Sequence, residues 1–278
     1  VGLGYVGAFL GLLLVVPFVE GEIPRLGWDL PFLEAGGRTA AFLPTAVLFA
    51  IFAIPIFLRV REPRRAREPR PGWTEAWRTL LGMLRDTRRY PGLRWFLLGN
   101  FLLLDAIHTA IIFMAVFVEK VVGLPDTAKA TFFMLATAPA ILGSVVAGRL
   151  ADRLGPRPVF LVTAWLWVLF PVIIALFPQP RVVYAAGAAI GVLLGSLWTV
   201  TRPFLLSLVA PGQEGRAFGI YAFANRSAAV LGPLLWGLTV YLAAPLGTDR
   251  YRLAILMLAG VAAVGALVLQ RVPRDEAA

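Results

Sequence analysis

Long apolar runs constrain the fold of this chain more than any other feature. A membrane-spanning helix needs roughly 20 mostly apolar residues. The runs are too long for the strands of a membrane barrel, and they lack the alternation of such strands. We therefore expect an all-α polytopic membrane protein with eight spans. They are Val1–Val19, Arg38–Leu58, Leu93–Val118, Ala128–Ala151, Val159–Phe177, Arg181–Leu208, Arg216–Ala243 and Tyr251–Leu269.

The composition supports a membrane protein and argues against several enzyme classes. Of the 278 residues, 59% are hydrophobic and 15% are charged, whereas soluble domains are about half apolar and about a quarter charged. The chain has no cysteine and one histidine, so disulfides, Cys-ligated metals, histidine-rich metal sites and catalytic triads are excluded. It has no phosphate-binding loop of the G-x-x-x-x-G-K-[ST] type. We expect no enzyme, no cofactor, no metal and no ATP-driven pumping by this chain.

The positive charge is distributed like a membrane topology signal. The formal net charge is +10, and the arginines and lysines lie mainly in the segments between the apolar runs. Because alternate loops lie on opposite sides, 18 of these residues fall on one side and 7 on the other, while Arg226 lies inside a span. Positive residues favour the cytoplasm, so segment 60–91 and the C-terminus are expected inside and Glu20–Gly37 outside. This distribution requires no nucleic-acid partner.

The spans fall into two groups separated by one true linker. Residues 1–59 hold two spans, residues 60–91 form a basic cytoplasmic linker, and residues 92–278 hold six. The second half of the linker, Trp73–Arg89, is expected to be a short amphipathic helix on the inner membrane face. The chain begins at Val1 inside an apolar run. We interpret that start as a cut through a larger protein of two six-span halves whose first four spans are absent.

A ten-residue motif lies between the fourth and fifth spans. It reads G-R-L-A-D-R-L-G-P-R, and its expected functional residues are Gly148, Asp152, Arg153, Gly155 and Arg157. The motif resembles the G-x-L-A-D-R-x-G-x-[RK] loop of the major facilitator superfamily (MFS), which implies a role in conformational switching. Gly148 is expected to permit close helix packing. Asp152 is expected to meet the positive end of a neighbouring helix, and the two arginines to hold the loop inside.

Further segments resemble the vacuole-effluxer-like branch of that superfamily, related to yeast vacuolar amino-acid effluxers. They are residues 4–7 (G-Y-V-G), 104–111 (L-D-A-I-H-T-A-I), 201–211 (T-R-P-F-L-L-S-L-V-A-P), 217–221 (A-F-G-I-Y) and 232–233 (G-P). Ala106, His108 and Pro203 depart from the pattern of the branch. The resemblance implies the MFS fold with helices 5–12 present. It also implies alternating access around a midplane site. The full-length protein is expected to be a monomer in a bacterial inner membrane.

Polar residues inside the spans are the candidates for the solute or ion path, because ionisable groups there are costly. Asp105 and Arg226 are expected to face the central cavity and to neutralise one another, directly or through water. His108 lies at i+3 from Asp105, on the same helix face, and is expected to modulate Asp105 or to accept a proton. A purely structural role for Asp105 or His108 remains open. Asn225 is a candidate beside Arg226, and the weaker cavity candidates are Asn100, Thr109, Thr137, Trp198 and Thr199.

Two further features concern the helix ends and the helix packing. Arg202 lies at an inner helix end and is the candidate for anchoring the cytoplasmic gate. The row Gly187, Gly191 and Gly195 puts three small residues on one helix face, which predicts close approach of another helix. We favour packing over a ligand role for these glycines.

The function expected from the sequence is secondary active transport of a small solute, with proton-coupled efflux of amino acids or similar metabolites as the working hypothesis. The alternatives are an eight-span membrane enzyme, which would need a polar cluster at one membrane face, and a non-transporting scaffold with a transporter-like fold. The sequence leaves the solute, the direction of transport and the coupling ion open.

Overall fold

The computed structural model describes residues 42–59, 91–210 and 212–273, together with positions 4, 7, 10–11, 14, 22–23, 28–29, 74 and 82. The chain divides into two compact units, Leu3–Gly72 and Trp73–Ala278, the latter taken with Val1–Gly2. The expected linker, with its amphipathic helix, lies almost wholly outside the described residues.

Residues 42–59, the longest described stretch of the first unit, form the apolar helix α2 (Phe42–Arg59), with Pro55 inside it. It confirms the expected second span with a later start. The first expected span lies largely outside the described residues. Two antiparallel strands of two residues each, β1 (Glu22–Ile23) and β2 (Trp28–Asp29), lie in the segment between the first two expected spans.

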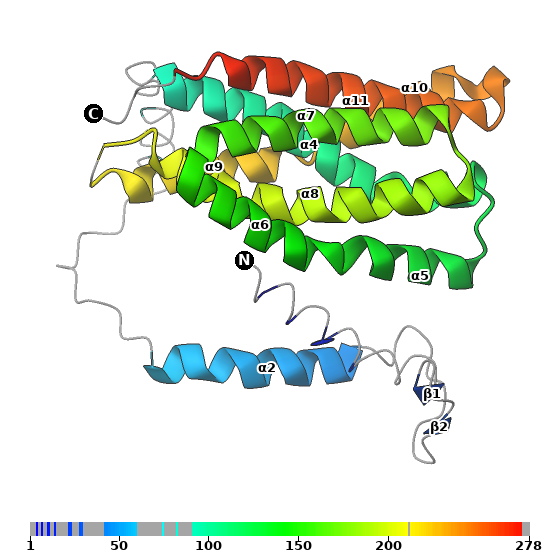
Figure 1. Ribbon diagram of the computed structural model, residues 1–278, viewed down its shortest axis with the longest axis horizontal. Helices are drawn as coiled ribbons and strands as arrows, with labels where there is room; N and C mark the ends of the chain where they lie inside the picture. The colour runs from blue at the N-terminus through cyan, green and yellow to red at the C-terminus, as the bar shows by residue number, and fades with distance from the viewer. Residues whose placement is uncertain are drawn as a thin grey trace. The chain divides into compact units, whose positions relative to one another are not determined.

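The second unit is a bundle of helices that lie lengthwise beside one another (Figure 1). In chain order these are α4 (Pro91–Lys120), α5 (Asp126–Thr137), α6 (Pro139–Leu154), α7 (Pro156–Leu176), α8 (Pro180–Leu206), α9 (Glu214–Ser227), α10 (Leu231–Leu242), the 3₁₀ turn η3 (Ala244–Leu246) and α11 (Asp249–Gln270). A proline opens α6, α7 and α8, a position where its missing N–H costs nothing and its fixed φ suits the helix. The all-α fold class is confirmed.

Six helices among the described residues are long and apolar enough to cross a membrane. They are Phe42–Arg59, Gly92–Lys120, Thr131–Leu154, Pro156–Leu176, Pro180–Leu206 and Asp249–Gln270. The fourth expected span, Ala128–Ala151, runs through α5 and α6, which meet at Ala138 just before Pro139.

The expected span Arg216–Ala243 is wrong as a single helix. It is two shorter helices, α9 and α10, separated by residues 228–230. Pro233 has no N–H to bond the Ala229 carbonyl, and its ring would clash with that carbonyl in a continuous helix. The second helix therefore restarts at Leu231, with Pro233 in its first turn, where a proline is tolerated.

Glycines allow the helices of the second unit to pack at close range. A Cβ at Gly191 or Gly195 of α8 would overlap the backbone carbonyl oxygen of Ala136 or Ala140 respectively. A Cβ at Gly187 would lie 2.6 Å from the Phe132 ring. The packing role expected for this row is thus confirmed. Elsewhere Gly99 of α4 meets Gly265 of α11, where added Cβ atoms would come within 2.8 and 2.9 Å of the opposite backbone oxygens.

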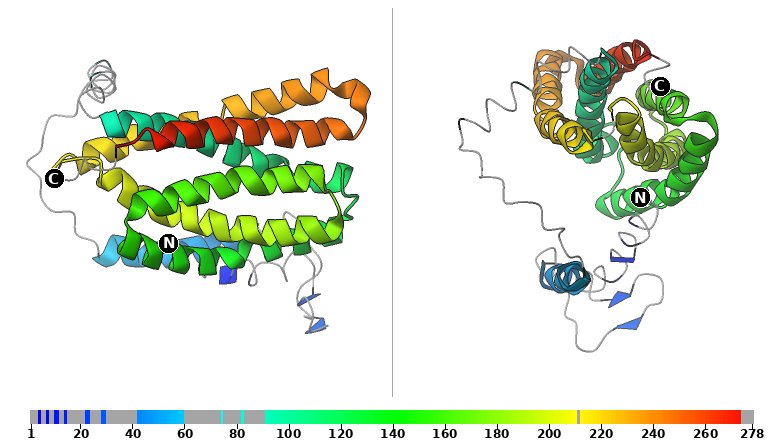
Figure 2. Two further views of the ribbon diagram at one scale, coloured as in Figure 1. Left: turned by 45° about the horizontal axis from the view of Figure 1, so that its top comes forward. Right: turned by 90° about the vertical axis from the view of Figure 1, so that its left-hand side faces the viewer.

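An aromatic cluster joins α4, α7 and α8 near one end of the bundle. Phe96 lies 5.0 Å from Phe204 and 5.8 Å from Phe160, measured between ring centroids. All three rings are fully buried. The right-hand view of Figure 2 shows the helices of this unit nearly end on, with α4 next to α10 and α11. This position makes α4 the element on which the polar side chains of the bundle converge.

Candidate functional site

The side chain of Asp105 is buried at the break between α9 and α10. It is 1% exposed, and its Oδ1 accepts a hydrogen bond of 2.9 Å from the backbone N–H of Gly232. That N–H belongs to the first turn of α10, where helical N–H groups lack partners within their own helix and carry partial positive charge. The Asp105 carboxylate on α4 therefore caps the N-terminal end of α10. Its second oxygen, Oδ2, is buried and has no hydrogen-bond partner among the described residues.

Thr109 and Gly232 fix this contact from both sides. The Thr109 hydroxyl donates to the Asp105 carbonyl oxygen at 2.7 Å, one turn back along α4. A Cβ at Gly232 would overlap the Thr109 Oγ1 and lie 3.0 Å from the Asp105 Oδ2. Only glycine leaves the backbone of α10 close enough to α4 for its N–H to reach the carboxylate.

A second polar contact joins α4 to α9. The Asn100 Nδ2 donates to the Asn225 Oδ1 at 3.2 Å, and Asn100 is fully buried. The Asn100 Oδ1 has no partner among the described residues. Asn100, Asp105, Thr109, Asn225 and Gly232 form what we call the polar seam. Its two unpartnered oxygens are both acceptors, so the seam suits a proton or another hydrogen-bond donor.

His108 and Arg226 do not join Asp105 as directly as the sequence suggested. The imidazole of His108 stacks on the indole of Trp198 from α8, with centroids 6.0 Å apart and an interplanar angle of 27°. Arg226 lies exposed in the last turn of α9. Among the described residues the ion pairs do not include one between Asp105 and Arg226, so the direct pairing of the two is not formed in this structure.

The motif loop lies between α6 and α7 and is tied to the end of α11. Gly155 takes a φ of +86° at this junction, a conformation that glycine adopts without steric cost. The guanidinium of Arg157 donates from Nε and Nη2 to the Val272 carbonyl oxygen at 3.1 and 2.8 Å, and from Nη2 to that of Gln270 at 3.1 Å. A cation is favourable at the C-terminal end of a helix, where carbonyl groups lack partners.

The remaining motif residues, and the gate candidate, lie at the surface of this unit. Asp152 and Arg153 are exposed in the last turn of α6, and Arg202 is exposed near the end of α8. The packing role expected for Gly148 is wrong, because a Cβ there would make an ordinary contact of 3.6 Å with the Thr199 Cγ2.

An apolar cavity of about 110 Å³ lies between α4, α5, α7 and α8. Its rim residue Ile111 is three positions beyond His108 on α4. Its lining includes Met114, Phe133 and Trp167. The indole N–H of Trp167 is buried without an acceptor among the described residues. Thr137, which the sequence suggested as a weaker cavity candidate, belongs to the lining. The cavity itself could not be predicted, because its wall forms only when four helices pack.

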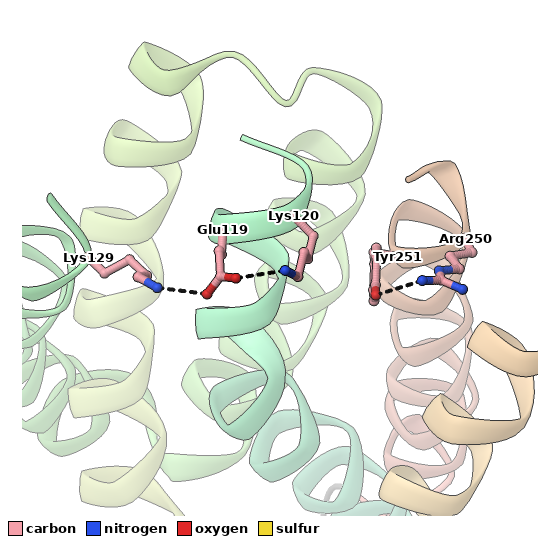
Figure 3. A network of polar contacts seen from close by, with 5 residues as sticks. All are labelled: Glu119, Lys120, Lys129, Arg250 and Tyr251. Carbon is pink, nitrogen blue, oxygen red and sulfur yellow. Dashed lines mark hydrogen bonds and ion pairs between the residues drawn. The ribbon is translucent and has the colours of Figure 1, made fainter. Parts of the chain in front are cut away.

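Charged residues mark the end of the bundle where α4 stops and α11 begins (Figure 3). The carboxylate of Glu119 accepts from Lys120 at 2.8 Å and from Lys129 at 2.7 Å, which ties the end of α4 to the start of α5. Arg250 donates to the Tyr251 hydroxyl at 3.1 Å. Because Glu119 and Lys120 are exposed, their pair adds little to stability. These contacts mark a helix end rather than a reaction centre.

The structure adds residues that sequence reasoning missed as parts of the site. Gly232 was noted only within a Gly-Pro pair, yet it supplies the partner of Asp105. A Gly-Pro pair inside an apolar run is a signal for a broken helix, and it could have been used. In the described part of the chain, no group of three or more His, Asp and Glu residues gathers as a metal site would require. The geometry suits binding and movement of a small solute or ion.

Comparisons with known proteins agree with the fold and the motifs. A family model described as "Vacuole effluxer Atg22 like" matches residues 2–278. The chain is 22% identical over 277 residues to the MFS-type transporter YxiO of Bacillus subtilis, covering 99% of this chain and 62% of that protein. It is 25% identical over 290 residues to autophagy-related protein 22 of Yarrowia lipolytica, covering 93% of this chain and 47% of that protein.

A solved structure shares the fold. It is a bacterial homologue of the human lysosomal transporter Spinster, in an inward-facing and unoccupied conformation, with a TM-score of 0.58 at 15% identity. The match covers 96% of this chain and 64% of that one. The chain thus spans about half to two thirds of the length of the proteins that it matches. The expected resemblance to the superfamily and to its vacuole-effluxer-like branch is confirmed.

Proposed function

Because the chain belongs to the vacuole effluxer Atg22-like family, we propose that the protein containing it is a secondary transporter that moves a small solute by alternating access. The observation that carries this proposal is the polar seam at the break between α9 and α10. In secondary transporters, substrate and ion sites lie where helices are interrupted near the bilayer midplane. Ionisable groups buried there are expensive and are commonly functional.

We assign the solute or ion path to residues on and beside the polar seam. They are Asp105, His108, Arg226, Asn225, Thr109 and Asn100. Arg226 lies in the last turn of α9, next to Asn225 of the polar seam and close in sequence to the break. His108 lies next to Trp198 at the half-buried edge of α4, where a solute can reach it more easily than it can reach Asp105.

We assign conformational switching to the loop that contains Gly148, Asp152, Arg153, Gly155 and Arg157. The hydrogen bonds from Arg157 to the end of α11 support this assignment, because they make α7 and α11 move together at that end. Arg202, near the C-terminal end of α8, remains the candidate for anchoring the inner gate.

Coupling, solute and location complete the proposal. The solute is a small metabolite such as an amino acid, and proton coupling supplies the energy. The family description names efflux, which supports export as the direction. The asymmetry of positive charge supports a cytoplasmic location for segment 60–91 and the C-terminus, and the bacterial relative supports an inner-membrane location. The protein acts as a monomer, with the bilayer as its partner.

Reconstitution tests the proposal. The full-length protein in liposomes is expected to move a labelled amino acid from a mixed panel faster when a proton gradient is imposed. Asp105→Asn should abolish the effect of the gradient. Arg181→Gln, an exposed change at the start of α8, should behave like wild type. Gradient-driven uptake that persists unchanged in Asp105→Asn would remove Asp105 from the coupling step, and absence of any uptake over a broad metabolite panel would overturn transport itself.

A further inference from the structure

The hydrogen bond from the Gly232 N–H to the Asp105 Oδ1 joins a titratable side chain to the backbone of α10, just after the break between α9 and α10. We propose that the Asp105 Oδ2 is the proton-binding site of the transporter and that its occupancy controls how firmly the first turn of α10 is held against α4. This inference rests on the proposed function, which it deepens by naming the atom that takes the proton and the element that responds.

The environment of Oδ2 is that of a site awaiting a proton. The carboxyl group is buried and accepts one backbone hydrogen bond through Oδ1, while Oδ2 has no partner among the described residues. A buried carboxylate needs a paired cation, or it becomes neutral. Among the described residues no cation forms an ion pair with Asp105. Protonation forms one O–H bond at Oδ2 with a proton taken from water and changes the charge of the group from −1 to 0.

The titratable groups around Asp105 are few. On α4 itself His108 lies one turn further along. On α9 the titratable residues closest in sequence to the break are Tyr221 and Arg226. The stretch of α11 that follows Arg252 and ends at Gln270 contains no acidic or basic residue. The titratable residue of α10 is Tyr241, which is exposed and lies next to the C-terminal end of that helix, opposite Gly232. His108 is therefore the alternative titrating group that an experiment must exclude.

The response follows from the strength of the capping bond. A hydrogen bond to an ionised acceptor is roughly twice as strong as one to a neutral acceptor, and a negative charge near a helix N-terminus is favourable in itself. Protonation removes both contributions, so the Gly232 N–H is held less firmly. The helices stay in contact because the absence of a Cβ at Gly232 still lets α10 lie against Thr109. The change is thus local to the break between α9 and α10.

Hydrogen–deuterium exchange on the full-length protein in lipid nanodiscs reads this response directly. Exchange of the amides of Leu231, Gly232 and Leu234, corrected for the intrinsic effect of pH, should lose about fivefold in protection as the pH falls from 8 to 5. Asp105→Asn keeps an acceptor oxygen for Gly232 without a titrating charge, so its corrected protection should not change with pH. His108→Gln should still lose protection as the pH falls, with the pH of the change moved because His108 lies one turn from Asp105 on α4.

The possible outcomes separate the inference from the proposed function. A wild-type protection that does not vary with pH overturns the inference, as does a response that survives Asp105→Asn or disappears in His108→Gln. A uniform change across all helices would indicate general loosening and would also overturn it. Uptake measured on the same preparations tests transport separately. A pH response at residues 231–234 without uptake of any solute would therefore refute the proposed function and leave the titration of Asp105 established.

Discussion

At the scale of single residues, Asp105 joins a structural role and a functional one. Its carboxylate, on α4, caps the N-terminal end of α10. A hydrogen bond to a charged acceptor is worth about 1.5–3 kcal/mol. A carboxylate used only for stability would be better satisfied at both oxygens, because an unpaired buried polar atom costs free energy. The unpartnered Oδ2 is the feature that separates this residue from a simple helix cap.

Gly232 gives the sharpest test at this scale. In Gly232→Ala the new Cβ would overlap the Thr109 Oγ1, so α10 must move away from α4 and the bond to Asp105 lengthens. We expect a loss of about 1–3 kcal/mol, the usual cost of overpacking, seen as a lower Tm in thermal unfolding of the purified protein. Gly237→Ala is the matched control, because it lies in the same helix and a Cβ there meets nothing within 4 Å. Equal Tm values for the two variants would contradict the close contact.

The sequence identified the polar residues of the site but not their partners. Asp105, Asn100 and Thr109 stand out because polar groups are rare in apolar runs. Their partners depend on which helices cross and at what height, and no residue spacing encodes that. The pairing of Asp105 with Arg226 was expected from charge alone. The structure gives the carboxylate a backbone N–H instead, since the break in the helix frees that donor.

At the scale of elements, hydropathy predicts helices well and their interruptions poorly. The expected span Leu93–Val118 differs from α4 by two residues at each end, because a run of apolar residues bounded by charges leaves little choice. Residues 228–230 are apolar like α10, whereas α9 before them is more polar and ends in Asn225, Arg226 and Ser227. The hydropathy therefore changes at the break, but no polar gap long enough to separate two spans marks it. Pro233 marks it, yet several other prolines, such as Pro171 and Pro203, lie inside continuous helices. Proline alone therefore does not predict a break.

Pro233 can be tested as the cause of the break. Pro233→Ala restores an N–H that the Ala229 carbonyl can accept from, and it removes the clash of the ring. We expect α9 and α10 to join, so that amides 228–231 gain protection in hydrogen–deuterium exchange and uptake slows because the break no longer flexes. Pro171→Ala, in the continuous helix α7, is the control and should leave residues 228–231 unchanged. If residues 228–231 of Pro233→Ala kept the wild-type protection, Pro233 would not be the cause of the break. Other contacts, such as the hydrogen bond from Gly232 to Asp105, would then keep α9 and α10 separate.

At the scale of the whole molecule, the motif loop and the end of α11 behave as one piece. Residues 155–157 and 270–272 are far apart in sequence, and three hydrogen bonds from one guanidinium join them. The aromatic cluster of Phe96, Phe160 and Phe204 lies in the same helices, α4, α7 and α8. In alternating access one half of a transporter rocks against the other, and such motion requires that each half keep its own shape. The clamp by Arg157 supplies part of that rigidity at the loop to which we assign the switch.

Substitution of Arg157 should therefore slow the conformational step without weakening the binding of solute. Arg157→Gln removes the charged fork, and Arg157→Lys keeps the charge but cannot donate from two nitrogens at once. Charged hydrogen bonds are worth about 1.5–3 kcal/mol, and 1.4 kcal/mol corresponds to tenfold, so we expect kcat for uptake to fall about tenfold in Arg157→Gln and less in Arg157→Lys. KM should stay within about twofold of wild type, because Arg157 lies at the end of the bundle, away from the polar seam. Arg181→Gln serves as the control for loss of an exposed arginine. A raised KM with unchanged kcat would show that Arg157 acts on the solute site, and the clamp would then have no part in switching.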